Sequence, residues 1–404
     1  MNASLHHRGP DGSGIYINNN VGLGHARLSI IDIETGQQPL LDVTNMVAVS
    51  FNGEIYNYKE LKLELEVLGY EFKTHSDTEV IVNAWLAWNT DCVSKFNGMF
   101  AFVLWDKSSK CFFAARDRLG IKPLHWAISS NNQLVISSEL KAIKNHDQIE
   151  LTINEQAIED FLTLGYIIEP KSIYKNINKL LPGHYIILNQ NEVNIEPICY
   201  WDLKDYISDD IKTVDQKHLL SLLNESVKKR MLADVPLGAF LSGGLDSTAI
   251  VALMNEQSPT NINTCSIGFD LSQYDESNFA ELVAKEFDTI HSTTNVSVND
   301  LSLVDVLIDV FDEPFADSSA LPTYLVSNKT REYVKVALTG DGGDEVFAGY
   351  NKHYMGKLNR KYTSVIPKFA HNGLKSVATN NSVRIFVIGV FIIVSFIYIS
   401  NVLE

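Results

Sequence analysis

Two folds in succession are predicted by this sequence: a layered α+β domain and, after it, a doubly wound α/β domain built on a parallel sheet. Up to about residue 200, short strands and hairpins alternate with only two inserted helices. After residue 217 the pattern changes to strand, loop and helix, which is typical of parallel strands joined by crossover helices. The chain has 404 residues, enough to give each domain its own core.

The α+β prediction depends on short β-branched segments bounded by turn residues and on two helical segments. In order, these segments predict strands at 21–32 and 47–51, helices at 57–68 and 76–88, and strands at 99–105, 111–116 and 133–138. The first helix follows from Leu61, Leu65 and Leu68, which share one helical face. The second begins with Ser76 and Glu79, whose S-x-x-E spacing is that of a capping box.

The α/β prediction begins beyond an acidic and polar linker at 201–217. The elements that follow are a strand at 237–241, a helix at 247–256, a strand at 265–269, a helix at 276–287 and a strand at 334–339. We therefore divide the chain into a first domain at 1–200, the linker, a second domain at 218–375 and a hydrophobic tail at 383–404.

The charge balance excludes one class of partner and leaves another open. With 49 acidic and 33 basic residues, the formal net charge is −16, which argues against binding to a nucleic-acid backbone. A small phosphate ligand is still compatible, because backbone N–H groups can hold one. The four cysteines are scattered without a CxxC pair, which argues against zinc and disulfides and favours the cytoplasm.

A phosphate-binding loop is predicted at residues 242–247, where SGGLDS joins an apolar strand directly to a helix. Successive glycines expose several N–H groups, and the helix N-terminus adds positive partial charge. Asp246 repels a phosphate, so a bridging Mg²⁺ is its natural partner. The loop is neither a Walker A loop nor a dinucleotide fingerprint. A bare SGG would more simply be a serine-capped turn, but the full hexapeptide favours phosphate binding.

A second glycine-rich and acidic segment, LTGDGGDEVFAGY at 338–350, follows the last predicted strand. This places the segment at the carboxyl edge of the parallel sheet, where ligands bind in such folds. Alone, this segment is also compatible with a Ca²⁺ loop or a solvated turn. Together the two segments resemble those of the glutamine-hydrolysing asparagine synthetase family, whose ATP-pyrophosphatase domain transfers AMP rather than phosphate to a carboxylate.

This resemblance implies that the protein uses ATP and Mg²⁺, and it assigns individual residues. Asp344 would be a Mg²⁺ ligand beside Asp246, and Asp341 would be catalytic, standing where many members have a glutamate that helps to form the aspartyl-adenylate. The segment DEPFADSSA at 312–320 would help to form the carboxylate-substrate pocket; by residue type alone it is also a capped turn. The implied ATP-binding residues are Leu241, Ser242, Gly243, Gly244, Asp246, Ser247, Ile267, Thr339 and Gly340.

The first domain resembles the class II glutamine amidotransferases through four short motifs. They are HRGPDG at 7–12, RLSII at 27–31, NGEIYN at 52–57 and SDTE at 76–79. The resemblance implies an N-terminal-nucleophile-type fold, in which stacked antiparallel sheets are flanked by helices. It also implies that glutamine is bound by Arg27, Asn52, Gly53, Glu54 and Asp77.

These residue types suit the groups of glutamine. The Arg27 guanidinium can bind the α-carboxylate, and Asp77, with Glu54 near it, suits the α-ammonium. The Asn52 side chain and the Gly53 N–H resemble an oxyanion hole, a catalytic role. Singly, each has a plainer explanation: a surface ion pair for the arginine, a hairpin turn for Asn-Gly, and the first turn of a helix for the aspartate.

The nucleophile of that chemistry is absent from its expected place. In the amidotransferases it is a cysteine that becomes the first residue of the mature chain, with its own amino group as the base. Here Met1 precedes Asn2, and the first cysteine is Cys92. We therefore predict that this chain releases no glutamate from glutamine and that its ammonia comes from solution.

The C-terminal segment 385–403 is nearly continuous in isoleucine, valine and phenylalanine, long enough to cross a bilayer core of about 30 Å. It is compatible with a membrane anchor, a buried helix or an accidental C-terminus after a frame disruption. We favour the last, because the body that resembles the family is cut at both ends, and the resemblance fades after 350–360, before the helices that supply a lysine in the family.

The leading functional expectation is asparagine synthesis. Aspartate and ATP would give aspartyl-AMP and pyrophosphate, and ammonia would then give asparagine. The alternatives are an amidotransferase for another carboxylate and a non-catalytic truncated fragment. Expected partners are glutamine or ammonia, aspartate and a second copy in a homodimer, with no nucleic acid, and a membrane only if the 385–403 segment is genuine.

Overall fold

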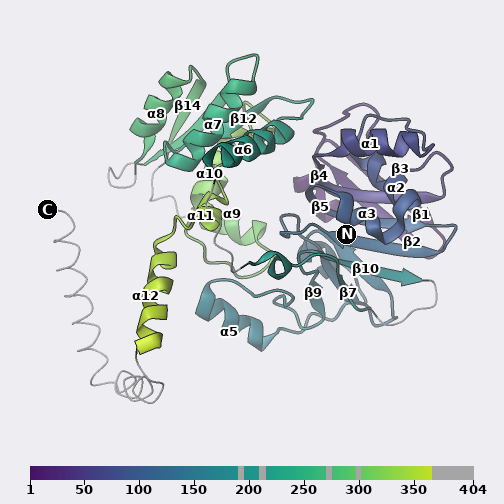
Figure 1. Ribbon diagram of the computed structural model, residues 1–404. Coiled ribbons are helices and arrows are strands. Elements are labelled where there is room, and N and C mark those ends of the chain that lie inside the picture. The colour runs from purple at the N-terminus through teal and green to yellow at the C-terminus, as the bar shows by residue number, and fades with distance from the viewer. Residues whose placement is uncertain (190–194, 209–214, 270–274, 297–301, 366–404) are drawn as a thin grey trace, which may run out of the picture. The chain divides into compact units, whose positions relative to one another are not determined.

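The computed structural model describes residues 1–365 except 190–194, 209–214, 270–274 and 297–301 (Figure 1). Two compact units make up the chain, 1–340 and 341–404, and each is described by itself. The first unit contains the antiparallel sheets and the parallel sheet. It opens with a short 3-10 helix, η1 (Asn2–Arg8).

The largest sheet of the first unit has six antiparallel strands. Their order is β11 (Ile198–Cys199), β10 (His184–Asn189), β6 (Cys111–Arg116), β5 (Gly98–Asp106), β4 (Val47–Ile55) and β3 (Leu40–Leu41). One face packs against α1 (Tyr58–Val67), α2 (Asp77–Trp88) and α3 (Cys92–Lys95). Phe96, Phe100, Phe102 and Phe113 are fully buried there, so this core excludes water from one side of β4 and β5.

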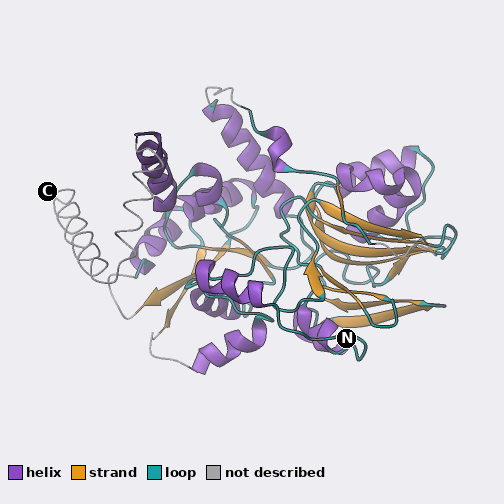
Figure 2. Cartoon of the chain, turned by 90° about the horizontal axis from the view of Figure 1, so that it is seen from below, coloured by secondary structure: helices purple, strands orange, loops and turns teal. Residues whose placement is uncertain are grey.

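Two smaller antiparallel sheets complete the N-terminal region. They are β1 (Gly12–Asn18) with β2 (Val21–Arg27), and β8 (Leu134–Ser137), β7 (His125–Ile128) and β9 (Ile177–Lys179). A second core, with Leu124, Leu180 and Ile186, joins the larger sheet to the β7–β9 region. Further helices, α4 (Leu140–Lys144) and α5 (Glu155–Leu164), pack on the three-stranded sheet. Figure 2 shows the strands in stacked layers with helices outside them, which confirms the predicted N-terminal architecture.

The remaining sheet is parallel and has the order β14 (Ile290–Val296), β13 (Asn263–Phe269), β12 (Leu237–Phe240) and β15 (Val336–Leu338). Its helices are α6 (Gln216–Arg230), α7 (Leu245–Gln257), α8 (Ser277–Glu286), α9 (Ser302–Val310) and α10 (Ala320–Thr330). The chain runs outward from β12 to β14 and then returns to the other side of β12. The strand order therefore reverses between β12 and β15, as expected for a doubly wound fold.

Several local expectations need correction. The Ser76 hydroxyl caps α2 by accepting a hydrogen bond from Thr78 N. Glu79, however, accepts from Lys73 N and Thr74 N, so the reciprocal half of the capping box was wrong. The predicted strands and helices otherwise shift by up to five residues at their ends. Elements that were not predicted include β1, β7, β9, β10, β14, α5, α6, α9 and α10.

The second unit begins after β15 with α11 (Gly343–Phe347) and α12 (Asn351–Val365). The hydrophobic 385–403 segment lies outside the described residues. Within the described ranges, the model contains no helix of the length and apolarity that membrane crossing requires. The linker is described in part, and there it forms the short 3-10 helix η3 (Leu203–Tyr206).

Candidate functional site

A cavity of about 700 Å³ lies in the N-terminal region and brings the predicted glutamine-binding residues together. All five line it: Arg27, Asn52, Gly53, Glu54 and Asp77. They come from the end of β2, from β4 and from the start of α2. Residues far apart in the sequence thus converge on a space large enough for an amino acid.

Arg27 is held in place by backbone oxygens. Its guanidinium donates to the carbonyls of Ile33 at 3.1 Å, Asp32 at 2.6 Å and Ile31 at 3.4 Å. Only 5% of Arg27 is exposed, and burial lowers the pKa of the guanidinium. The simpler explanation as a surface ion pair was therefore wrong, because this cation is anchored inside the molecule and borders the cavity.

Asn52 and Gly53 lie in the middle of β4, opposite Ala101 and Phe100, so the hairpin-turn alternative was wrong. A Cβ on Gly53 would lie 2.1 Å from the Met99 carbonyl oxygen, so only glycine fits. Asn52 Nδ2 is buried and has no hydrogen-bond partner in the described part of the chain. An unpaired buried amide donor is costly unless a ligand completes it, so this atom suits a substrate oxygen.

The two carboxylates of the cavity resist ionisation. Asp77 lies in the first turn of α2, a position that favours an aspartate whether or not a ligand binds. Its Oδ2 also accepts a hydrogen bond from Ile55 N at 3.0 Å. Burial raises the pKa of Asp77. For Glu54, burial first and the charge of Asp77 second raise the pKa to about 9. An ammonium group entering the cavity would favour ionised carboxylates and so bind here.

Further polar residues line the cavity, among them His25, Ser50 and Lys122, which the sequence-based prediction missed. His25 Nδ1 lies 3.1 Å from Ser50 Oγ, and burial lowers the pKa of His25 to about 4, so the imidazole is neutral near pH 7. Lys122 also lines the cavity, from the turn after β6. Only its position in a Gly-Ile-Lys-Pro turn could have drawn attention to it. None of the four cysteines lines the cavity, and burial raises the pKa of the Cys92 thiol.

The HRGPDG motif lies beside the cavity and anchors its surroundings. His7 and Arg8 both contact the Glu139 carboxylate, at 3.0 and 2.9 Å. Asp11 accepts from Ser29 N at 2.9 Å, which fixes the loop after β2. The motif therefore holds the cavity wall, and of its residues Arg8 borders the cavity.

The second predicted site is the 242–247 loop at the carboxyl end of β12. Ser242 Oγ lies 3.0 Å from Ser247 Oγ and accepts from Gly244 N at 3.2 Å. Gly243 has a φ of +82°, and a Cβ there would lie 2.5 Å from Phe279 Cβ on α8. The loop thus folds tightly against α8 and leads into the N-terminus of α7, where anions bind favourably.

Gly340, after β15, brings the second motif to the first. A Cβ on Gly340 would lie 2.8 Å from Ser247 N and 3.0 Å from Asp246 Cβ. The backbone of 339–340 therefore passes directly over the start of α7, at the point where the strand order reverses. Of the other predicted ATP-binding residues, Leu241 is buried beside this loop, Ile267 is half-buried on β13, and Thr339 precedes Gly340.

Asp341 and Asp344 belong to the second unit. Asp344 is in the first turn of α11, where its carboxylate lies against Gly349. No group of three or more His, Cys, Asp or Glu side chains in the described residues is arranged to hold a metal. Mg²⁺ commonly uses one or two carboxylates together with substrate phosphates, so the donor type of Asp246 fits this ion.

The DEPFADSSA segment contacts the N-terminal region. Asp312 Oδ2 accepts from Lys141 N at 3.1 Å, and Glu313 forms an ion pair with Lys179. Ala316 N donates to the carbonyl of Gly165 at 2.8 Å. These contacts fix the segment against the N-terminal region, and its predicted role in a carboxylate-substrate pocket stays a prediction.

Comparisons with known proteins bear on both sites. The family model described as a glutamine amidotransferase domain matches residues 1–201, and the one described as asparagine synthase matches 218–386. A putative glutamine-hydrolysing asparagine synthetase of Methanocaldococcus jannaschii is 41% identical over 91% of this chain and 75% of its own length. The chain belongs to the glutamine-hydrolysing asparagine synthetase family.

Other members of the asparagine synthetase family are more distant. Asparagine synthetase 1 of Bacillus subtilis is 36% identical over 87% of this chain and 55% of its own length. Asparagine synthetase B of Escherichia coli is 31% identical over 86% of this chain and 60% of its own length. This chain therefore spans between about half and three quarters of these relatives.

Proposed function

We propose that the chain synthesises asparagine from aspartate, ATP and ammonia. An aspartate carboxylate oxygen would attack the α-phosphorus of ATP, and pyrophosphate would leave. Ammonia would then attack the acyl carbon, and AMP would leave. The observation that carries this proposal is the close approach of Gly340 to the start of α7, which puts both family loops at one edge of the parallel sheet.

The nucleotide would be held chiefly by the 242–247 loop. The N-terminus of α7 and the glycine N–H groups suit the phosphates, and Ser242 and Ser247 add hydroxyl groups. Asp246 would hold Mg²⁺, which neutralises phosphate charge when it is bound, and the role of Asp344 as a second ligand stays a prediction from the sequence. Asp341 would act on the carboxylate that is adenylated, and Leu241, Ile267 and Thr339 would border the nucleoside.

The cavity around Arg27 would bind glutamine without hydrolysing it. Arg27 would hold the α-carboxylate, Asp77 and Glu54 the α-ammonium, and Asn52 the side-chain carbonyl oxygen. No thiol lines this cavity within the described part of the chain. We expect glutamine to release glutamate no faster with the chain than in buffer alone. Release above that rate from the purified chain would contradict this part of the proposal.

The adenylation step is tested by pyrophosphate release from ATP in the presence of ammonium. We expect release that depends on aspartate and that is lost in Asp246→Asn, with ATP binding weakened in the same variant. Release with a different carboxylate but not with aspartate would favour the alternative amidotransferase. ATP binding without pyrophosphate release would favour a non-catalytic fragment.

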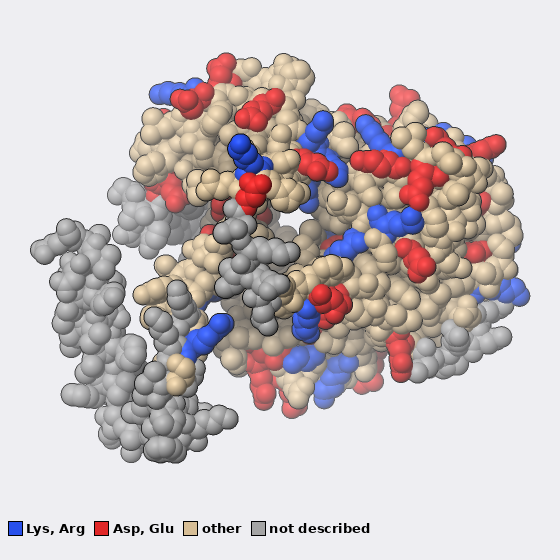
Figure 3. Space-filling model, in the orientation of Figure 1, with Lys and Arg blue, Asp and Glu red and all other residues tan. Residues whose placement is uncertain are grey.

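A cytoplasmic location and a homodimer stay predictions. Acidic and basic side chains are interspersed on the surface shown in Figure 3. Sedimentation of the purified chain at several concentrations tests the dimer, and a single monomeric species throughout would exclude it.

A further inference from the structure

Asn2 brings an unpaired hydrogen-bond acceptor to the wall of the cavity around Arg27. It is the first residue of η1, and its Nδ2 donates to the His25 carbonyl on β2 at 3.2 Å. Because that partner is an acceptor, the amide nitrogen must face it, which identifies the other amide atom as the oxygen. Asn2 Oδ1 is buried and has no hydrogen-bond partner among the described residues. An unpaired buried acceptor costs free energy, so a donor from a ligand would be favourable there.

The geometry of η1 places this side chain at the cavity. A 3-10 helix has three residues per turn, so residues three apart share one face. Asn2, Leu5 and Arg8 have this spacing, and all three line the cavity. The far end of the helix is held by the ion pair of Arg8 with Glu139 at 2.9 Å. Gly9 follows so close to β2 that a Cβ there would lie 2.1 Å from a backbone carbon of that strand. One face of η1 is therefore a fixed part of the cavity wall.

Contacts join the Asn2 amide to β4, the strand that carries Asn52. A Cβ on Gly24 would lie 3.3 Å from Asn2 Cγ and 3.4 Å from Asn2 Oδ1, so the amide packs on the backbone of Gly24. The Gly24 carbonyl accepts from Ser50 Oγ at 3.0 Å, and the same Oγ lies 3.1 Å from His25 Nδ1. Ser50 and Asn52 are two positions apart on β4, so they point to the same face, and both line the cavity.

Asn52 offers the complementary atom, a buried amide nitrogen with no partner in the described part of the chain. Side chains two positions apart on a strand begin about 7 Å from each other, so an unpaired acceptor and an unpaired donor stand at a similar spacing in this cavity. A carboxamide has both groups that these atoms lack, a carbonyl oxygen and an NH₂. With a hydrogen bond of about 3 Å at each end, one carboxamide can join them.

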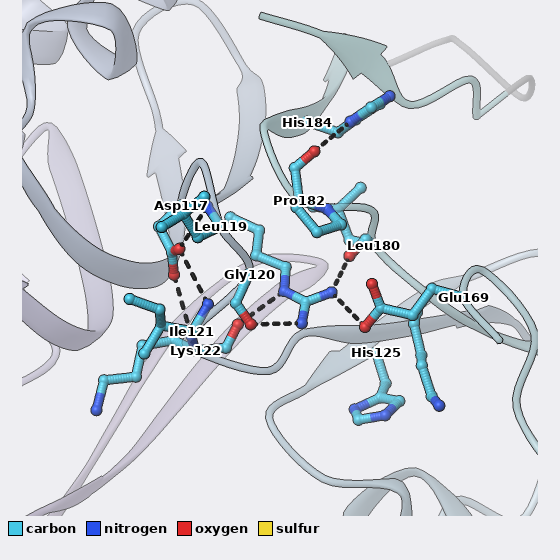
Figure 4. Close-up of polar contacts among 12 residues, drawn as sticks. Asp117, Leu119, Gly120, Ile121, Lys122, His125, Glu169, Leu180, Pro182 and His184 are labelled. Atoms are coloured by element: carbon cyan, nitrogen blue, oxygen red, sulfur yellow. Dashed lines mark hydrogen bonds and ion pairs between the residues drawn. The ribbon is translucent and has the colours of Figure 1, made fainter. Parts of the chain in front are cut away.

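Several other acceptors of the cavity wall are already engaged. Gln38 Oε1 accepts from Phe51 N at 2.7 Å. The Lys122 carbonyl accepts from Arg116 Nε at 2.8 Å, in the turn drawn in Figure 4, and the Lys122 ammonium can only donate. The two carboxylates of the cavity suit the α-ammonium of glutamine. The amide nitrogen of the ligand is thus left for Asn2 Oδ1.

We propose that Asn2 is a specificity-determining residue, which accepts a hydrogen bond from the side-chain NH₂ of glutamine while Asn52 donates to the oxygen of the same carboxamide. This inference rests on the proposed binding of glutamine in the cavity and deepens it, because it assigns a partner to the amide nitrogen. A ligand with a carboxylate or an ester in place of the carboxamide would bring an oxygen to Asn2 Oδ1. Two acceptors repel each other, so such ligands bind less well.

The test measures binding to the full chain by titration calorimetry, with two ligands. One is L-glutamine; the other is L-glutamic acid γ-methyl ester, which keeps the α-groups and the side-chain carbonyl oxygen but has no side-chain NH₂. The variants are Asn2→Leu, which removes the polar atoms at similar size, and Gly24→Ala, whose methyl would displace the Asn2 amide. Asn20→Leu is the matched control, because Asn20 is exposed in the turn between β1 and β2.

The expected result separates the two ligands. The parent chain should bind glutamine about tenfold more tightly than the ester, because only glutamine gives the buried acceptor a donor. Asn2→Leu should lower the affinity for glutamine about tenfold without weakening ester binding, so that the preference disappears. Gly24→Ala should reduce the preference in the same direction, and Asn20→Leu should leave both affinities unchanged.

Three outcomes overturn the inference. One is equal affinity of the parent chain for the two ligands, a comparison that needs no variant and so stands even where a substitution unfolds the chain. Another is a preference for glutamine that survives in both Asn2→Leu and Gly24→Ala. The third is equal weakening of both ligands in Asn2→Leu, which would show that Asn2 only supports the fold of η1. A parent chain that binds neither ligand would instead contradict glutamine binding itself.

Discussion

At the scale of single residues, the cavity shows how burial changes chemistry without changing residue type. Arg27, Glu54 and Asp77 are ordinary charged residues in the sequence, and the sequence also allowed a plainer explanation for Arg27 and for Asp77. Inside the fold, Arg27 is anchored by three backbone oxygens, and the two carboxylates are held where ionisation is costly. All three residues line one cavity, and this shared position is what the sequence alone does not show.

Glu54 makes stability depend on pH. Burial and the charge of Asp77 raise the pKa of Glu54 from its usual value of 4.5 to about 9 in the folded chain, so folding takes up a proton between these limits. The resulting contribution to stability is full below about pH 4.5 and is lost as the pH rises through about 9. Glu54→Gln should gain stability relative to the parent by at least ~1 kcal/mol on going from pH 5 to pH 9. Urea unfolding at both values measures this, and an unchanged difference would contradict it.

Gly53→Ala tests the close contact of β4 with β5. The added methyl would meet the Met99 carbonyl oxygen at 2.1 Å, so the strands must separate where the cavity is formed. We expect a loss of about 1–3 kcal/mol in the free energy of unfolding and no glutamine binding. Gly12→Ala is the control, because a Cβ there meets nothing within 4 Å. Equal effects of the two substitutions would rule out the contact as the cause.

At the scale of elements, the two sites form where secondary structures end or meet. The 242–247 loop leaves β12 and enters α7, and Gly340 follows β15 on the other side of the strand-order reversal. The predicted glutamine-binding residues lie on β2, on β4 and at the start of α2. In both sites, the pairing of strands that are distant in the sequence sets where the site residues lie.

Gly340→Ala should weaken ATP binding. Its methyl would approach Ser247 N to 2.8 Å and push the 339–340 backbone away from the start of α7. Loss or distortion of one phosphate hydrogen bond predicts about a tenfold lower affinity. Calorimetric titration with ATP measures it, with Gly22→Ala as the control because that position has open space. Unchanged ATP affinity would show that the two loops do not share the nucleotide.

Ser76→Ala probes the start of α2, which carries Asp77. Removing the hydroxyl leaves Thr78 N without its cap and should cost about 1 kcal/mol of stability. We expect glutamine affinity to fall as well, because Asp77 is the next residue. Thermal unfolding together with glutamine titration checks both effects, and a stability loss with unchanged affinity would separate the cap from the site.

At the scale of the whole molecule, the sequence predicted the order of the two folds and both loops, because hydrophobic periodicity and glycine-rich turns are local signals. It could not predict that Glu79 would bond to Lys73 N and Thr74 N, or that Asn52 and Gly53 lie mid-strand, since partner choice depends on tertiary pairing. Lys122 was missed for the same reason, because it reaches the cavity from a turn far along the chain from the other lining residues of β2 and β4.

We propose that this chain of the asparagine synthetase family amidates aspartate with ammonia from solution and not with nitrogen from glutamine. The most direct test measures whether a nitrogen isotope label enters the amide group of asparagine when ATP, aspartate and Mg²⁺ are present. Labelled ammonium should label asparagine, and amide-labelled glutamine should not. Label from glutamine in the product, or no labelled asparagine from either source, would contradict the account.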